Sequence, residues 1–152
     1  MSDELKHECG IALVRLLKPL EYYKEKYGTA FYGINKMYLM MEKQHNRGQD
    51  GAGLGVVKFD MPAGDPYLLR VRSNKHNAIE RIFDAITEDT AQLGETPITA
   101  ENEIETKQQC RFLGEAYLGH LRYGTHSGNS VANNHPFVRK SNIASRNIAL
   151  AG

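Results

Sequence analysis

The strongest constraint on the fold is a predicted hairpin near the middle of the chain. Two mainly apolar stretches, residues 54–59 and 67–72, flank residues 61–66, which contain two prolines and a glycine. Proline and glycine mark turns, and the second stretch alternates side chains as a half-exposed strand does. Consecutive strands joined by a short turn pair antiparallel, so this part of the chain predicts an antiparallel sheet.

Other apolar patterns predict helices and strands on either side of the hairpin. Large apolar side chains recur at helical spacing in two places. Near the second of these, Asn77 and Glu80 resemble a capping arrangement. The predicted elements are a buried strand at residues 10–17, helices at 30–44 and around 79–86, and strands at 115–122 and 147–151.

The order of these elements favours an α+β fold, in which helices pack on an antiparallel sheet. Two segments are expected to lie outside the core. Residues 18–30 are charged and rich in tyrosine, which predicts a surface excursion. Residues 87–109 carry six acidic side chains against one lysine, which predicts a solvated insertion.

The amino-acid composition limits the classes of protein to which this chain can belong. The chain has 152 residues, of which 41% are hydrophobic and 24% charged, as in one ordinary globular domain. The net charge of +1 gives no electrostatic case for a nucleic-acid or anionic-membrane partner. No apolar run approaches the ~20 residues of a membrane span. Two cysteines without a secretory signal favour reduced thiols and a cytoplasmic location.

The first catalytic candidate is Cys9, which opens the predicted first strand and follows Glu8. If the bond between these two residues is cut, Cys9 gains a free α-amino group beside its thiol. The pKa of an α-amine is about 7.7–8.0 and that of a thiol about 8.5, so such an amine can act as the base for its own thiol. Residues 1–8 would then be a propeptide that blocks the nucleophile. The alternative is a small apolar side chain on a core strand, where free cysteines are common.

The second candidate is Arg122, which lies where a predicted strand meets a glycine-rich loop. A guanidinium pairs bidentately with a carboxylate, so Arg122 suits the α-carboxylate of a small amino-acid substrate. Thr125 and His126 follow in the loop and are expected to line the same pocket. The alternative for Arg122 is a surface ion pair, which contributes little to stability. No metal site is predicted, because no cluster has the spacing of metal ligands.

A family resemblance rests on four stretches of the sequence. These are Cys9-Gly10-Ile11, Gln44-His45-Asn46-Arg47-Gly48-Gln49-Asp50, Gly119-His120-Leu121-Arg122-Tyr123-Gly124-Thr125 and Asn134-His135-Pro136-Phe137. Together they resemble the glutaminase domain of glutamine phosphoribosylpyrophosphate amidotransferase (amidophosphoribosyltransferase). That family belongs to the class II glutamine amidotransferases, which use an N-terminal cysteine nucleophile. The similarity covers most of residues 8–152, with gaps.

The resemblance implies a four-layer α/β/β/α sandwich of the Ntn-hydrolase type with antiparallel sheets. It implies that the cysteine attacks the side-chain amide of glutamine and that water then releases glutamate. The ammonia would travel to a phosphoribosyltransferase domain in cis and displace pyrophosphate in purine biosynthesis. No cofactor is implied for residues 9–152, and Mg²⁺ is expected in the phosphoribosyltransferase domain. The family is usually oligomeric, which leaves a homo-oligomer open.

The resemblance also implies roles for individual residues. Arg122 would bind the α-carboxylate of glutamine, and its neighbours would line the pocket. A short propeptide ending in glutamate precedes the cysteine in several family members, as Glu8 does here. The site residues implied are Cys9 as the nucleophile, Glu8 and Cys9 at the cleaved bond, and Arg122, Tyr123, Thr125, His126 and Arg47 around the substrate.

The sequence also departs from the family pattern. Asn46 is an additional residue inside its loop motif. The family's oxyanion pair should follow Leu150-Ala151, where this sequence has Gly152 and ends, and no phosphoribosyltransferase domain is present. Loss of one oxyanion donor typically lowers kcat by about 10²–10³. The expectation is therefore a truncated glutaminase domain at residues 9–152 with little glutaminase activity.

Two other functions remain open. One is a stand-alone N-terminal-nucleophile amidase that acts on another amide. The other is a non-catalytic binding or regulatory module that keeps the fold while Cys9 stays blocked. Substrate preference distinguishes the first, and the mass of the purified chain, with or without residues 1–8, distinguishes the second.

Overall fold

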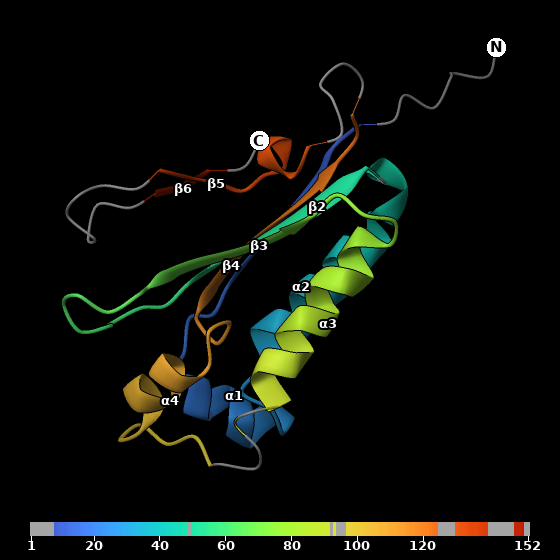
Figure 1. The fold of residues 1–152 in the computed structure, drawn as a ribbon. Coiled ribbons are helices and arrows are strands. Elements are labelled where there is room, and N and C mark those ends of the chain that lie inside the picture. Colours follow the sequence, from blue (N-terminus) through green and yellow to red (C-terminus); the bar gives the residue numbers. More distant parts are fainter. Residues whose placement is uncertain are drawn as a thin grey trace.

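A four-stranded antiparallel sheet in the order β1-β4-β2-β3 organises the fold (Figure 1). The computed structural model describes residues 8–48, 50–91, 93, 97–124, 130–139 and 148–150. The elements are β1 (Gly10–Arg15), α1 (Leu20–Tyr27), α2 (Tyr32–Lys43), the 3-10 helix η1 (His45–Arg47), β2 (Gly51–Val57), β3 (Leu68–Ser73), α3 (Ala78–Ala91), α4 (Glu103–Gln109), β4 (Ala116–Arg122), the 3-10 helix η2 (Val131–Asn133), β5 (Phe137–Arg139) and β6 (Ile148–Leu150).

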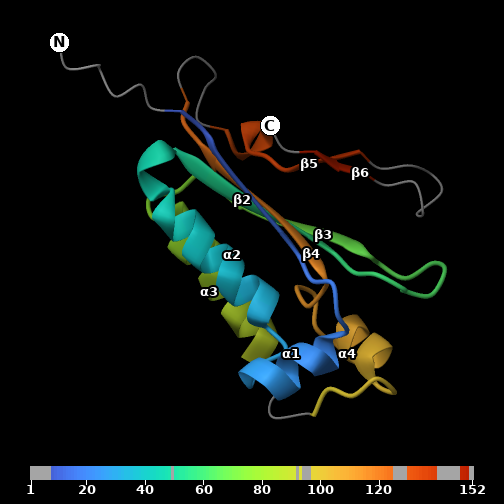
Figure 2. The same cartoon turned by 180° about the vertical axis from the view of Figure 1, so that it is seen from behind.

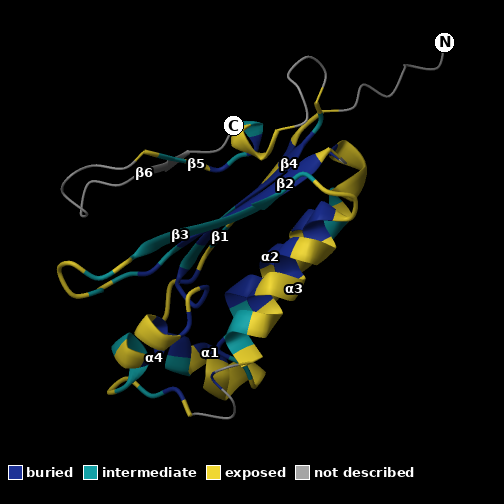
Figure 3. Ribbon diagram, in the orientation of Figure 1, coloured by how far each residue is buried: buried dark blue, intermediate teal, exposed yellow. Residues whose placement is uncertain are grey.

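The long helices form one layer against the sheet. α2 and α3 lie side by side on one face, and the two-stranded sheet of β5 and β6 lies on the opposite side (Figures 1 and 2). Residues of α2 and α3 three to four positions apart turn toward the sheet and are buried there (Figure 3). The main hydrophobic cluster includes Ile34, Met37 and Met41 of α2 and Ile82 and Ile86 of α3.

The two faces of the sheet follow from strand alternation. Tyr117 and Leu121 of β4 belong to the cluster under the helices. A side chain at Gly119 would meet the side chains of Met37 and Met41, so this glycine lets α2 approach the sheet closely. The alternate residues of β4, including His120 and Arg122, therefore point to the other face, toward β5.

A second hydrophobic cluster lies at the far end of the sheet, under α1 and α4. This finding corrects two predictions. Residues 18–30 are more than a surface excursion, because they form α1 and bury Leu20 and Tyr23. Residues 87–109 are not a solvated insertion, because α3 runs to Ala91 and α4 follows. The cluster comprises Leu16, Leu20, Tyr23, Ala30, Leu93, Ile98, Cys110 and Leu113.

Charged side chains are buried at this same end, and each of those described here has hydrogen-bond partners. Lys107 Nζ lies 2.6 Å from Glu115 Oε1 and also donates to the carbonyl of Phe59. Lys58 Nζ donates to the carbonyls of Lys107 and Cys110, and burial lowers the pKa of Lys58. The second oxygen of Glu115 accepts from the Phe59 backbone N–H at 2.8 Å. These bonds fasten α4 to the ends of β2 and β4.

Other predicted elements agree with the structure except at particular positions. The helix at residues 30–44, the hairpin and the strand at 115–122 are confirmed as α2, β2–β3 and β4. The strand at residues 10–17 is shorter and not buried on both faces, because 48% of Ile11 and 65% of Leu13 are exposed. Asn77 directly precedes α3, and its carbonyl accepts from the Arg81 backbone N–H at 3.1 Å, but its φ of +57° is left-handed rather than the extended backbone typical of a helix N-cap.

The fold is a mixed α+β structure with an antiparallel sheet, as predicted. In the described ranges it contains a helical layer, the four-stranded sheet and the small sheet of β5 and β6. None of the helices described is long and apolar enough to span a membrane.

Candidate functional site

The strand register brings Cys9 and Arg122 together at one end of the sheet. Gly10 of β1 pairs with Leu121 of β4, so the next position outward on each strand sets Cys9 opposite Arg122. Directly opposed residues on antiparallel strands share a face, and their Cα atoms lie about 4.5–5.5 Å apart. Cys9 is an exposed free thiol immediately before β1. The two leading sequence candidates, 113 positions apart in the chain (122 − 9), are therefore neighbours in the fold.

Arg122 is not a surface residue. Only 5% of it is exposed, although it is the last residue of β4. The backbone N–H of Asp50 donates to the Arg122 carbonyl at 3.1 Å, and the Gly124 N–H donates to Asp50 Oδ2 at 2.8 Å. A side chain at Gly124 would contact the Arg122 guanidinium at 3.4 Å. Asp50 and Gly124 thus fix the chain around the guanidinium, which is buried rather than on the surface.

The loop between α2 and β2 packs against this end of the sheet. A side chain at Gly48 would come within 2.7 Å of the Arg122 backbone, so glycine is required for the approach. Gln44 Nε2 donates to the carbonyl of Ile11 at 3.3 Å, and its side chain covers Gly10. The loop motif therefore buttresses both strands that carry the candidate residues. Arg47, predicted to lie near the nucleophile, is in η1 of this loop and exposed.

The segment Asn134–Phe137 crosses the sheet over a row of glycines in β2. A Cβ atom at Gly53 would lie 1.8 Å from the His135 carbonyl oxygen, and one at Gly51 would lie 2.5 Å from Asn134 Nδ2. The strand predicted at residues 54–59 left these glycines outside it, but they are part of β2. Their missing side chains leave the space in which the segment lies.

Two arginines of β3 hold the same segment by its backbone. Arg72 Nη1 donates to the Asn134 carbonyl at 2.8 Å, and Arg70 Nη1 donates to the Pro136 carbonyl at 3.2 Å. Asn134 Nδ2 donates to the Ser73 carbonyl at 2.8 Å. Burial and the nearby Arg70 lower the pKa of Arg72. The position of Asn134 beside Arg122 is therefore set by β3 as well as by the glycines.

Two buried polar groups beside Arg122 lack hydrogen-bond partners. His120 is 2% exposed, and in the described ranges neither of its ring nitrogens has a partner. Asn134 is fully buried, and its Oδ1 likewise has none. An unsatisfied buried polar group costs about 1–3 kcal/mol, so such groups in native proteins call for a water, a ligand or a functional role.

The protonation state of His120 follows from its surroundings. Burial, followed by electrostatic interaction with His135 and Arg122, lowers the pKa of His120 to about 4. The rings of His120 and His135 are in contact, tilted by 38° with their centroids 4.6 Å apart. Near neutral pH the His120 imidazole is therefore uncharged, with one nitrogen able to accept a hydrogen bond.

The other predicted site residues divide into two groups. Glu8 is exposed next to Cys9, and Tyr123 is half-buried directly after Arg122. Thr125 and His126 lie outside the described residues.

The sequence interpretation missed His120 and Asn134, although both are inside the quoted motifs. The signal was present, because His120 is two positions before Arg122 and so shares its face of the strand.

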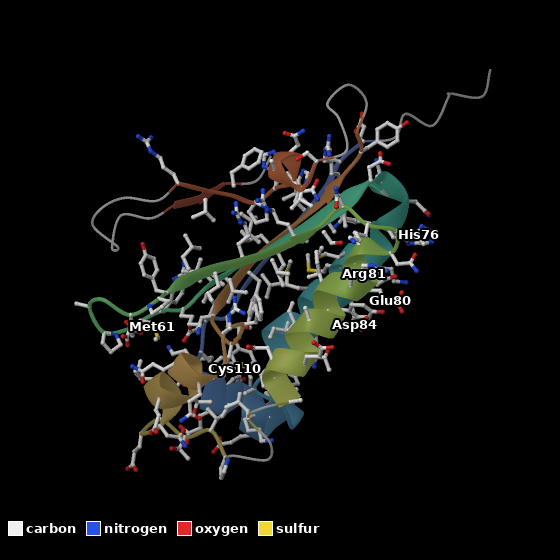
Figure 4. The ribbon with its side chains drawn as sticks, viewed as in Figure 1. Met61, His76, Glu80, Arg81, Asp84 and Cys110 are labelled. Atoms are coloured by element: carbon white, nitrogen blue, oxygen red, sulfur yellow. The ribbon has the colours of Figure 1, made fainter. Side chains whose placement is uncertain are left out.

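Two cavities are found elsewhere on the molecule. One, of about 420 Å³, surrounds the β2–β3 turn near Met61 (Figure 4). A larger one, of about 760 Å³, lies between the ends of α2 and β2 and the start of α3, where Figure 4 shows His76 and Glu80. This larger pocket meets the Arg122 site at Gly48 and Asp50. Across the described ranges, no three His, Cys, Asp or Glu side chains are grouped to hold a metal ion.

Comparisons of the chain with protein-family models, with curated proteins and with solved structures find no match.

Proposed function

We propose that this chain is the glutaminase portion of an amidophosphoribosyltransferase, which hydrolyses glutamine through Cys9. In this proposal the ammonia passes to a phosphoribosyltransferase domain in cis for the formation of 5-phosphoribosylamine in the cytoplasm. The partners are glutamine and that domain, and Mg²⁺ serves the domain rather than residues 9–152. The layered Ntn-hydrolase sandwich belongs to the same proposal.

The supporting observation is that the four motifs converge at one end of the sheet. Register sets Cys9 beside Arg122. The loop from Gln44 to Asp50 packs against both strands, and Asn134 lies over Gly51, the β2 partner of Arg122. A thiol, a buried guanidinium and polar groups on one face are the parts that hydrolysis of an amino-acid amide requires.

The chemistry follows from these groups. The α-amine of a mature Cys9 takes the thiol proton, and the sulfur attacks the side-chain carbonyl carbon of glutamine. The C–N bond then breaks, ammonia leaves with the proton, and a thioester remains. Water attacks the thioester, which releases glutamate and restores the thiol. Arg122 holds the α-carboxylate throughout, so it orients the amide without entering the reaction.

Calorimetry tests the proposal directly. The chain without residues 1–8 is titrated with L-glutamine and with glutamine whose α-carboxylate is converted to an amide. L-glutamine should bind at least about tenfold more tightly, and Arg122→Lys should lose most of this difference because lysine lacks the bidentate geometry. Exposed Arg81→Lys on α3 is the matched control. Equal binding of both ligands would favour the stand-alone amidase, and no glutamine binding would overturn the proposal.

The regulatory-module alternative is tested by mass. If Cys9 is the nucleophile, protein expressed from the complete reading frame should lose residues 1–8, and Cys9→Ala should retain them. Retention in both proteins would favour the module in which Cys9 stays blocked.

A further inference from the structure

We propose that His120 and Asn134 accept hydrogen bonds from the α-ammonium group of the amino acid whose carboxylate pairs with Arg122. This inference rests on the proposed function and adds the residues that recognise the amine. It assigns to this chain groups that bind both the carboxylate and the ammonium of a free α-amino acid, rather than of any amide.

The placement of the three side chains supports this assignment. His120 and Arg122 share one face of β4, two positions apart. Asn134 lies on the same face above Gly51, which is the β2 partner of Arg122. The guanidinium is therefore bordered by an imidazole along its own strand and by an amide across the neighbouring strand.

Asn134 and His120 both carry hydrogen-bonding atoms that no other described residue uses. Asn134 uses its Nδ2 on the Ser73 carbonyl, which leaves Oδ1 as the acceptor. Within the part of the chain that the structure describes, His120 uses neither ring nitrogen, although it is almost completely buried. Buried acceptors without donors are expected where a ligand or water supplies the missing hydrogens.

The chemistry of the three groups matches both ends of an amino acid. An α-amino acid carries a carboxylate and an ammonium on the same carbon. Arg122 supplies donors only, whereas Asn134 Oδ1 and an uncharged imidazole nitrogen supply acceptors. Among the described residues, the charged and titratable side chains around His120 are Arg122 on β4, His135 on the crossing segment and Arg72 across Gly53. The described carboxylate beside the Arg122 guanidinium is Asp50, since a Cβ atom at Gly124 would lie 3.4 Å from Arg122 Nη2 and 3.6 Å from Asp50 Oδ2. An ammonium therefore meets neutral acceptors here.

The test compares L-glutamine with 4-carbamoylbutanoate, which is glutamine without its amine. By calorimetry, the chain without residues 1–8 should bind L-glutamine at least about tenfold more tightly. His120→Phe keeps the ring contact with His135 but has no acceptor, so it should lose this preference and leave 4-carbamoylbutanoate binding unchanged within about twofold. His120→Gln, which retains an acceptor, should restore part of the preference. Exposed His76→Phe is the matched control.

A second measurement avoids dependence on the folding of variants. In the ¹⁵N spectrum of the unsubstituted chain, the imidazole nitrogens of His120 should shift with L-glutamine and not with 4-carbamoylbutanoate. If glutamine binds but neither the preference nor the shift is seen, the His120 nitrogens face water alone and this inference fails while the proposed function stands. If L-glutamine does not bind at all, the proposed function itself fails.

Discussion

The two ends of β4 bury polar side chains in opposite ways. At the first end, Glu115 precedes the strand and is matched by Lys107 and by the Phe59 backbone. At the other end, His120 and Arg122 are equally buried, but His120 has no hydrogen-bond partner in the described ranges. The sheet thus carries one internally satisfied polar cluster and one that is incomplete.

This difference in hydrogen bonding distinguishes a structural polar cluster from a candidate functional site. A buried ion pair with all its hydrogen bonds made has nothing left to offer a ligand, and it fastens α4 to the sheet. Polar groups that stay unsatisfied lower the stability of the isolated fold, and that cost is offset when a ligand binds. Burial alone would identify the polar residues at both ends of β4 as candidate functional sites. The hydrogen-bond partners of these residues distinguish one end from the other.

The two cysteines give the largest contrast between the ends. Burial raises the pKa of Cys110 to about 12, with Asp89 contributing, whereas Cys9 is exposed. The thiolate fraction of Cys110 is then about a thousandfold below that of a thiol of ordinary pKa. Iodoacetamide at pH 8 should therefore modify Cys9 at least a thousandfold faster, as followed by peptide mass. Comparable rates in the folded protein would contradict the contrast.

Removal of one partner should damage the satisfied end severely. Lys107→Met leaves the Glu115 carboxylate buried without its cation, which should lower the free energy of unfolding by about 3–5 kcal/mol. Urea denaturation measures this change. Glu115→Gln added to Lys107→Met should recover part of the loss, and exposed Lys18→Met should change stability by no more than about 0.5 kcal/mol. A loss for Lys107→Met as small as that control would show that the cluster does not fasten the fold.

The glycine row at the incomplete end should tolerate added side chains unequally. Gly53→Ala places a methyl group 1.8 Å from the His135 carbonyl, and such overpacking should cost about 1–3 kcal/mol. Gly55→Ala meets Pro136 at 3.1 Å and the Leu118 carbonyl oxygen only at 3.8 Å, so it should cost less. Thermal unfolding of both variants measures the difference. If both were stabilised, as alanine in an open strand would be, the segment from Asn134 to Phe137 would not lie on β2.

The pH dependence of stability should reveal His120 with a smaller effect. The pKa of His120 is lowered to about 4 in the fold, against about 6.5 when unfolded. The unfolded chain therefore binds more protons between these values, so stability is complete above pH 6.5 and falls as the pH is lowered toward 4. The loss should be on the order of 1–2 kcal/mol. His120→Phe should remove this component from urea denaturation measured at pH 7 and pH 4.5, and an unchanged pH profile would contradict it.

Much of the main sheet and its helical layer could be predicted from local sequence patterns. The hairpin was marked by its prolines and glycine, and α2 by apolar residues at helical spacing. The segment at residues 87–109 could not be predicted, because its acidic composition suggested solvent while its few apolar residues, such as Leu93 and Ile98, are buried against α1. So few apolar residues form no periodic pattern in the sequence. Their burial is determined by tertiary packing.

The sequence predicted the residue types of the candidate site. It did not predict which of their polar atoms have hydrogen-bond partners. Cys9 and Arg122 stood out as a thiol and a cation at the ends of strands, and the register then placed them together. Gly51 and Gly53 were left outside the predicted strand because glycine is rare in strands, and the crossing segment explains their presence in β2. The absence of partners for His120 is a property of three-dimensional packing that no sequence pattern shows.

The most direct test of the incomplete end is covalent labelling with a diazoketone analogue of glutamine, 6-diazo-5-oxo-L-norleucine. The sulfur of Cys9 would displace nitrogen gas from the reagent and form a thioether, which peptide mass spectrometry locates. The chain without residues 1–8 should carry one adduct, on Cys9, and L-glutamine should protect it at concentrations where 4-carbamoylbutanoate does not. Labelling that ignores L-glutamine, or that persists in full with Arg122→Lys, would contradict the account.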